Sequence, residues 1–195
     1  MNSSIVSIGL SNPGAPIPQA EIARFMQLAH QLDGQERRKL DFLYRKSGID
    51  FRHSVLDDFQ KEEVAEFTFF PKNKELSPFP STSARMNVFE AEAAGLAEQA
   101  VRNALQQANI EPASLTHLVL VSCTGMVAPG VELELMRRLG MPSSVQRYCI
   151  HFMGCYAAFT GLRLADQLVK ANPESRVLVV SVELCTIHFQ KEYNE

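Results

Sequence analysis

The sequence lacks the features that mark several classes of protein. Its 195 residues hold 19 Lys and Arg against 22 Asp and Glu, so no basic excess is available to neutralise a nucleic-acid backbone. No apolar run approaches the roughly 20 residues that span a bilayer. Residues 1–10 have none of the Lys or Arg that begins a secretory signal. We therefore expect a soluble, cytoplasmic protein whose main partners are neither nucleic acids nor membranes.

Cysteine is scarce as well. Cys123, Cys149, Cys155 and Cys185 form no C-x-x-C pair and show none of the spacings of zinc sites. Disulfides are not expected, because no secretory signal directs the chain to an oxidising compartment. The dinucleotide motif G-x-G-x-x-G is also missing. We therefore expect no metal ion or redox cofactor, and the question becomes whether one free thiol is reactive.

The composition is that of a globular domain. Hydrophobic residues make up 46% of the chain and charged residues 21%, which argues against disorder or a coiled coil as a description of the whole. A chain of this length suits one ordinary domain, or half of a larger protein with two lobes.

Hydrophobic periodicity predicts the elements of the first part of the chain. Residues 4–10 have the composition of a strand, residues 49–55 are expected to be extended, and residues 71–83, with three prolines, indicate a loop. Helices are expected over residues 19–32, 35–46 and 83–108, the last with Ser83 as its N-cap.

The second part of the chain alternates between strands and helices. Strands are predicted at residues 115–123, 145–152 and 176–183, with helices at 130–139 and 155–170 between them. This order implies βαβ units and a mostly parallel sheet, which must be covered on both faces. Residues 184–195 are polar toward the end and offer no obvious closing element. We therefore expect that something outside this chain completes the fold.

One turn between a strand and a helix stands out for its chemistry. The segment H-F-M-G-C-Y-A-A, residues 151–158, leads from a strand through Gly154 to Cys155, which is expected to open the next helix. The first amides of a helix lack intrahelical partners and favour an anion nearby. A thiolate would be stabilised there, and a backbone N–H of the turn could receive the oxyanion of an acyl transfer. The pattern favours Cys155 as a nucleophile.

Packing is the alternative for each of these thiols. A cysteine beside small residues is often a compact core residue, and this interpretation applies to Cys155 as well. For Cys123, Cys149 and Cys185, which lie in or beside predicted strands, residue types alone favour packing.

Three segments in order carry a resemblance to a known family. They are C-T-G-M-V-A-P-G-V-E-L-E-L-M-R-R-L-G at residues 123–140, Q-R-Y-C-I-H-F-M-G-C-Y-A-A at 146–158 and R-V-L-V-V-S-V-E at 176–183. Together they resemble type III polyketide synthases, the chalcone- and stilbene-synthase-like members of the thiolase superfamily. The resemblance is strong over residues 83–189 and weaker over 38–55, where K-S-G-I-D-F-R-H-S resembles an early motif of the family.

The resemblance implies an α/β fold. Residues 1–195 would form the nucleophile-bearing, N-terminal half of the thiolase-like αβαβα layers, with a mostly parallel sheet covered by helices. In this family a cysteine accepts an acyl group from acyl-CoA, and the carbanion from decarboxylated malonyl-CoA then attacks the bound thioester. Cys155 matches that cysteine. The family's second half, not in this chain, supplies a His and an Asn, and His151 is not expected to replace them.

The resemblance also assigns residues to the substrates. Ala128 stands where the family usually has Met, and Cys185 where plant members often have Thr, so a strict chalcone synthase is not expected. The alternatives are a solvated helix face for the lysines, a structural carboxylate for Glu183 and packing for His188. The assigned pocket residues are Cys123, Thr124, Ala128, Glu183, Cys185 and His188, and the residues assigned to CoA phosphates are Lys39 and Lys46, with Phe42 in place of a third basic residue.

The implied partners are acyl-CoA and malonyl-CoA, used as substrates with no cofactor, together with a second copy of the chain or a complementary C-terminal half. A ketoacyl-ACP synthase III-like condensing enzyme shares the fold and the cysteine. The A-P-G loop at residues 128–130 favours the polyketide synthase. A non-catalytic partner subunit is a further alternative, which the missing His and Asn favour and the Cys155 turn opposes. The starter group, the number of extensions and the cyclisation mode stay open.

Overall fold

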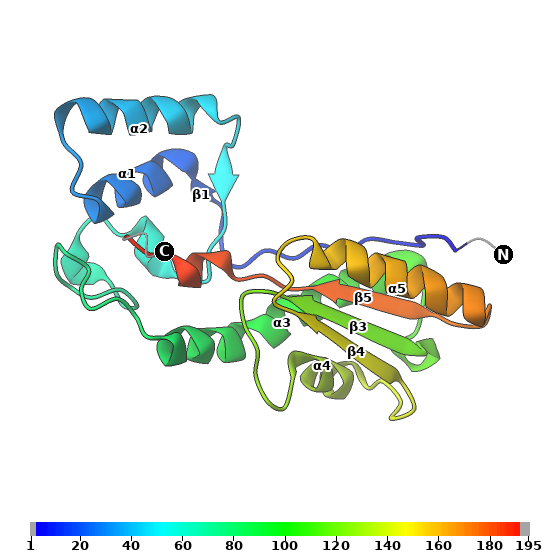
Figure 1. The fold of residues 1–195 in the computed structure, drawn as a ribbon. Helices are drawn as coiled ribbons and strands as arrows, with labels where there is room; N and C mark the ends of the chain where they lie inside the picture. Colours follow the sequence, from blue (N-terminus) through cyan, green and yellow to red (C-terminus); the bar gives the residue numbers. More distant parts are fainter. Residues whose placement is uncertain (1–2, 192–195) are drawn as a thin grey trace. The chain divides into compact units, whose positions relative to one another are not determined.

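The computed structural model describes residues 3–191, and the chain divides into two compact units (Figure 1). The first unit comprises Met1–Ser11 and Met86–Leu184, and the second comprises Asn12–Arg85 and Cys185–Glu195. The long helix α3 (Thr82–Ala108) starts at the end of the second unit and lies mostly in the first. Its N-cap is Ser81 rather than Ser83, because the Ser81 hydroxyl accepts a hydrogen bond from the Ala84 N–H at 3.2 Å.

A three-stranded parallel sheet organises the first unit. The strands β3 (His117–Ser122), β4 (Gln146–His151) and β5 (Val177–Ser181) lie in the order β4-β3-β5. Helix α4 (Val131–Leu139) connects β3 to β4, and α5 (Ala157–Ala171) connects β4 to β5. All six residues of the central strand are buried, as its apolar run predicts. The predicted βαβαβ order and the parallel sheet are confirmed.

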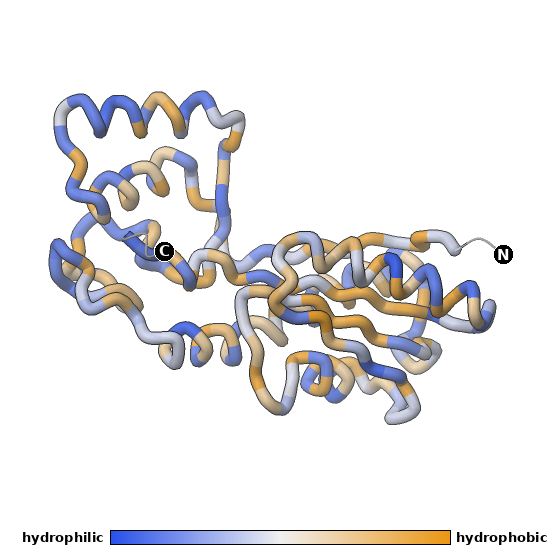
Figure 2. Tube along the Cα trace, in the orientation of Figure 1, coloured by the Kyte–Doolittle hydropathy of each residue, from blue (hydrophilic) through white to orange (hydrophobic). Residues whose placement is uncertain are grey.

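Helices cover the two faces of this sheet, α5 on one and α4 on the other (Figure 1). Figure 2 shows β3 and β5 as mainly hydrophobic, whereas β4 also carries hydrophilic residues. Small residues let α5 approach closely: Ala157 is fully buried against Val119 and Val121. A Cβ added at Gly161 would lie only 3.1 Å from the Val121 side chain. The turn that carries Cys155, before α5, therefore adjoins a tightly packed helix.

The strand expected at residues 4–10 is wrong, because these residues form no ladder. Their neighbour is helix α3 rather than a strand. The Ser7 hydroxyl donates to the Ala104 carbonyl at 2.8 Å, and a Cβ at Gly9 would lie 2.0 Å from the Ala100 carbonyl oxygen. The backbone N–H and C=O groups of a helix are already paired with each other. Residues 4–10 therefore find no strand partner in α3, and their apolar residues cannot produce a strand here. Four of the segment's apolar side chains stay exposed: Ile5, Val6, Ile8 and Leu10.

In the described part of the second unit, helices α1 and α2 accompany a small antiparallel ladder. Helix α1 (Gln19–Ala29) stops three residues earlier than predicted, and Gln31 adopts a left-handed φ of 53° just beyond it. Helix α2 (Gly34–Lys46) agrees with its prediction. Of the extended segment at 49–55, only β2 (Phe51–Arg52) is a strand, and it pairs with β1 (Ile17–Pro18). Two short 3-10 helices, Asp57–Gln60 and Val64–Glu66, follow.

Aromatic rings form the core of the second unit. The Phe25 ring lies 4.3 Å from that of Phe59 and 5.4 Å from that of Phe189, measured between centroids, with Phe67 and Phe70 nearly as close. Phe189 follows the 3-10 helix Cys185–His188, so this cluster anchors the end of the described chain to α1.

Candidate active site

The turn between β4 and α5 presents Cys155 to solvent. The helix begins at Ala157, two residues later than predicted, and Tyr156 is its N-cap. Cys155 therefore precedes the helix rather than opening it. The Ala157 N–H closes the turn by donating to the Gly154 carbonyl oxygen at 3.0 Å. Within residues 3–191, the Cys155 N–H donates a hydrogen bond to no atom. The turn thus combines an exposed thiol with an available amide on the same residue.

Two left-handed residues shape this turn. Phe152 has a φ of 58° and Gly154 a φ of 73°. A Cβ at Gly154 would meet no atom within 4 Å, so the backbone angle rather than crowding requires glycine there. For Phe152 the same region costs on the order of 1–2 kcal/mol. Such a conformation persists only where neighbouring contacts hold it, and the end of β3 supplies these contacts.

Two hydrogen bonds join the end of β3 to this turn, one before its apex and one after it. The Phe152 N–H donates to the Ser122 carbonyl oxygen at 3.3 Å, which extends the β3–β4 ladder by one residue. After the turn's apex, the Cys123 thiol donates to the Gly154 carbonyl oxygen at 3.2 Å. Cys123 is only half-buried, so its interpretation as a simple core thiol is incomplete. Its side chain joins the end of β3 to the turn that carries Cys155.

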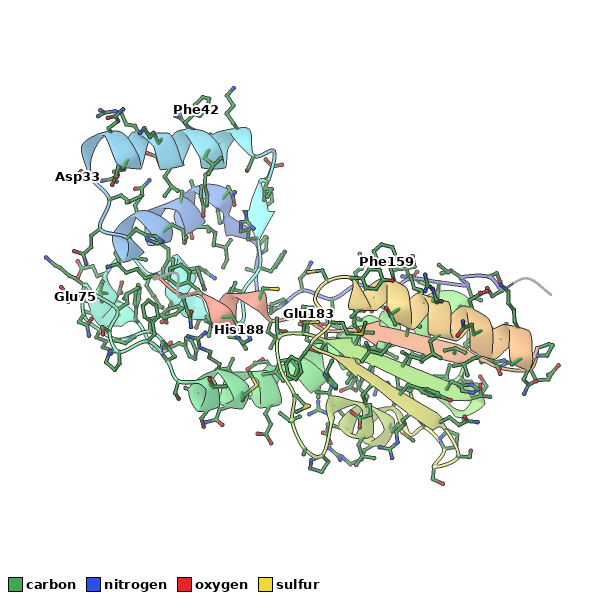
Figure 3. All side chains as sticks on the ribbon, viewed as in Figure 1. Asp33, Phe42, Glu75, Phe159, Glu183 and His188 are labelled. Atoms are coloured by element: carbon green, nitrogen blue, oxygen red, sulfur yellow. The ribbon has the colours of Figure 1, made fainter. Side chains whose placement is uncertain are left out.

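Glu183 fixes Cys123 in turn. It follows β5 (Figure 3), and its two carboxylate oxygens accept from the Cys123 N–H at 2.9 and 3.1 Å. The Thr124 hydroxyl donates to the same carboxylate at 2.7 Å and accepts from the Leu184 N–H at 2.8 Å. Cys123, Thr124 and Glu183, all predicted site residues, thus form one network beside the Cys155 turn. Glu183 is exposed rather than buried, and its hydrogen bonds fit the structural alternative, while its role in a pocket stays a prediction.

Ala128 lies exposed in the loop between β3 and α4. The start of this loop is held by packing: Gly125 is buried, and a Cβ there would lie 2.1 Å from the ring of the fully buried Phe89. The assignment of Ala128 to the pocket stays a prediction.

The second unit carries the other predicted site residues. Cys185 and His188 are exposed on the 3-10 helix Cys185–His188, whose Ile187 is fully buried. Thr186 on the same helix hydrogen-bonds Ser54 at 2.8 Å. His188 is labelled in Figure 3. The structure thus places both residues on a well-anchored, solvent-facing turn of this unit, and their role in a pocket stays a prediction.

Lys39 and Lys46 are exposed on α2. Seven residues apart, they lie two helical turns from each other on one face. Phe42, which is 59% exposed, lies between them and points outward from α2 (Figure 3). The helix places two cations and one ring in a row, and CoA binding by this row stays a prediction.

Cys149 is the thiol on β4 whose surroundings oppose ionisation. Desolvation, followed by the negative charge of Glu132 and a hydrogen bond to it, raises the pKa of Cys149 to about 11, although Arg147 opposes the shift. A higher pKa means that less of the reactive thiolate is present at neutral pH. Cys149 therefore lacks the character of a nucleophile, although its side chain is exposed rather than packed as its residue type predicts.

We expect iodoacetamide to alkylate Cys149 roughly a hundredfold more slowly at pH 8 than an unperturbed thiol, because its thiolate fraction is about a hundredfold smaller. Peptide mapping of a time course between pH 7 and 10 measures this rate, which should still be rising at pH 10. Removing the negative charge with Glu132→Gln should accelerate the reaction. A Cys149 rate equal to that of free cysteine across this range would contradict the expectation.

Three features of the structure were not predicted from the sequence. The Ser122 hydroxyl and His151 Nδ1, on paired residues of β3 and β4, are buried without hydrogen-bond partners in the described chain. The left-handed φ of Phe152 has no sequence signal, because aromatic residues rarely adopt it. The third feature is the fully buried Asp58, whose short polar stretch resembles an ordinary turn.

Residues 3–191 contain neither a metal-ligand cluster nor a membrane-spanning helix. No group of three or more His, Cys, Asp or Glu in that range is arranged to hold a metal ion. Among the helices of the same range, none has the length and apolar character needed to cross a membrane.

Comparisons with known proteins agree with this architecture. Residues 2–195 match the family model of the N-terminal domain of chalcone and stilbene synthases. A probable polyketide synthase of Dictyostelium discoideum is 31% identical over 96% of the chain and 6% of its own length. An alpha-pyrone synthesis polyketide synthase-like protein of Mycobacterium tuberculosis is 34% identical over 80% of the chain and 38% of its own.

Solved structures show the same likeness. The C-terminal type III polyketide synthase domain of Steely1, a hybrid from Dictyostelium, superposes with a TM-score of 0.83 at 30% identity, over 100% of this chain and 51% of that one. A polyketide synthase of the brown alga Ectocarpus siliculosus gives 0.85 at 31% identity, over 97% and 50%. The chain thus spans about half the length of these structures. The predicted α/β thiolase-like fold is confirmed for this half.

Proposed function

Because the chain belongs to the chalcone and stilbene synthase family, whose N-terminal domain it matches, we propose that it accepts an acyl group from acyl-CoA on Cys155. The single observation that carries this proposal is the exposed Cys155 on a turn that β3 holds in a strained conformation. Strained backbone of this kind concentrates at functional sites. We also propose that the complete enzyme extends this acyl group by condensation with malonyl-CoA.

The proposed first step is a transthioesterification. The Cys155 thiolate attacks the carbonyl carbon of the acyl-CoA thioester, and a C–S bond to the enzyme forms as the carbonyl oxygen becomes an oxyanion. The Cys155 N–H, which has no partner in residues 3–191, is available to donate to this oxygen. When the carbonyl re-forms, the bond to the CoA sulfur breaks. CoA leaves as a thiolate that takes up a proton, and the acyl group stays on Cys155.

Extension follows in the proposed reaction. Malonyl-CoA loses carbon dioxide, and the electron pair of the broken C–C bond forms a carbon nucleophile that attacks the acyl thioester and displaces the Cys155 thiolate. The His and Asn of the family's second half would stabilise the thiolate and the enolate, so complete turnover needs that half. Large apolar side chains lie close to Cys155 in the sequence and would be available to an acyl chain: Phe152, Met153, Tyr156 and Phe159 are all at least half exposed.

We further propose where CoA and the protein partners bind. The exposed row of Lys39 and Lys46 on α2 suits the phosphates of CoA, which attract cations on a helix face. The working assembly would be a homodimer, or a complex with a complementary C-terminal half, in the cytoplasm. The CoA thioesters are substrates, and the proposed reaction needs no cofactor. A ketoacyl-ACP synthase III-like enzyme is the alternative, and it would accept acyl groups from acyl carrier protein in preference to CoA.

Intact-mass spectrometry tests the proposal directly. The purified chain is incubated with a panel of acyl-CoAs of increasing length, and we expect a single added acyl mass that peptide mapping places on Cys155. Cys155→Ala should remove the adduct, whereas the matched variant Cys149→Ala should retain it, because the Cys149 thiol is mostly protonated. An adduct that survives in Cys155→Ala, or no adduct from any acyl-CoA, would overturn the proposal. Loading from acyl carrier protein alone would favour the alternative.

A further inference from the structure

Cys123 holds a place in the turn that its assignment as a pocket residue does not explain. Its thiol donates to the Gly154 carbonyl oxygen at 3.2 Å, across 31 residues of sequence. That oxygen also accepts from the Ala157 N–H at 3.0 Å. One carbonyl beside the nucleophile is therefore held by two donors, one from the following helix and one from the end of β3.

The Gly154 carbonyl belongs to the same rigid peptide unit as the Cys155 N–H. A peptide bond is planar, and this one is trans, so its C=O and N–H point in opposite directions. Holding the carbonyl toward Cys123 therefore directs the Cys155 N–H away from the end of β3. This N–H donates to no atom of residues 3–191. The peptide is kept in the orientation in which its amide stays available.

The anchor is itself fixed. The Cys123 N–H donates to both carboxylate oxygens of Glu183, at 2.9 and 3.1 Å. Without the hydrogen bond from Cys123, the backbone of the turn would be able to change conformation, because it contains two left-handed residues, Phe152 and Gly154. Rotation of the Gly154–Cys155 peptide needs only coupled changes in the flanking ψ and φ angles, which glycine permits.

We propose that Cys123 is a positioning residue for acyl transfer, whose thiol orients the Gly154–Cys155 peptide so that the Cys155 N–H can receive the oxyanion. The inference rests on the proposed role of Cys155 as the acyl acceptor, but it does not depend on recognition of CoA. Cys123 acts through the peptide and forms no bond to the acyl group. Its loss should therefore slow only reactions that build an oxyanion at this turn.

Two reagents separate this role from a structural one. With p-nitrophenyl acetate, Cys155 attacks the ester carbonyl, an oxyanion forms, and nitrophenolate leaves as the acetyl group stays on sulfur. With iodoacetamide, Cys155 displaces iodide from carbon and no oxyanion forms. We expect Cys123→Ala to slow acetylation of Cys155 roughly tenfold while its alkylation changes less than twofold. Cys123→Ser, which restores a donor, should recover most of the acetylation rate, and Cys149→Ala should change neither reaction.

Peptide mapping assigns each modification to Cys155, and infrared spectroscopy follows the hydrogen bond itself. The S–H stretching band lost in Cys123→Ala should lie at lower frequency than that of a thiol without an acceptor. The proposal is overturned if Cys123→Ala slows both reactions equally, if it slows neither, or if this band shows no shift. A chain that is acetylated by the ester but not by any acyl-CoA would contradict the proposed function and leave this inference standing.

Discussion

Replacing Asp58 with alanine is expected to destabilise the second unit by about 3–5 kcal/mol, a large share of the stability of an ordinary domain. The Asp58 side chain is fully buried and accepts four hydrogen bonds. Its oxygens receive the Thr68 N–H at 2.7 Å and hydroxyl at 2.9 Å, and the N–H groups of Phe69 at 3.0 Å and Phe70 at 2.8 Å. Alanine would leave these donors without an acceptor, at a cost of about 1–3 kcal/mol for each buried one.

Urea unfolding followed by circular dichroism measures this loss. Asp57→Ala is the matched control, because Asp57 lies on the same 3-10 helix and is exposed. It should change the free energy of unfolding by no more than about 0.5 kcal/mol. Asp58→Asn should also destabilise, since an amide group would replace one of the two acceptor oxygens with a donor. Equal midpoints for Asp58→Ala and Asp57→Ala would show that the carboxylate does not hold this segment.

Phe25→Ala is expected to have a similar effect, about 3–5 kcal/mol, because it leaves a cavity among aromatic rings. Phe25 is 1% exposed and contacts the rings of Phe59, Phe67, Phe70 and Phe189. Of these contacts, the one with Phe189 links the aromatic core to the segment that carries Cys185 and His188. Its loss should release the segment that carries Cys185 and His188, and chymotrypsin should then cleave faster after Phe189.

The matched control is Phe42→Ala on α2, which removes a ring that is 59% exposed. It should shift the urea midpoint little and leave the chymotrypsin cleavage rate unchanged. Loss of stability in Phe25→Ala without faster cleavage at Phe189 would mean that the segment is anchored by other contacts, such as the buried Ile187. A midpoint for Phe25→Ala equal to that of Phe42→Ala would contradict the role of the cluster as the core of this unit.

Local patterns account for the parts of the fold that were predicted. The buried run of β3 and the periodicity of α5 are properties of neighbouring residues, so both elements were recognised to within two residues. Residues 4–10 show the limit of this reasoning. Their composition suits a strand, but a strand needs a partner with unpaired backbone groups, and the structure places helix α3 beside them.

The sequence by itself determined the order of strands and helices from β3 to β5, the parallel sheet and the position of Cys155 on the turn between β4 and α5. It did so because hydrophobic spacing and glycine breaks act over a few residues. Only the tertiary structure decided what holds that turn. The contact of Cys123 with Gly154 spans 31 residues and that of Cys123 with Glu183 spans 60. Such contacts depend on strand register and on packing between elements, which no local pattern encodes.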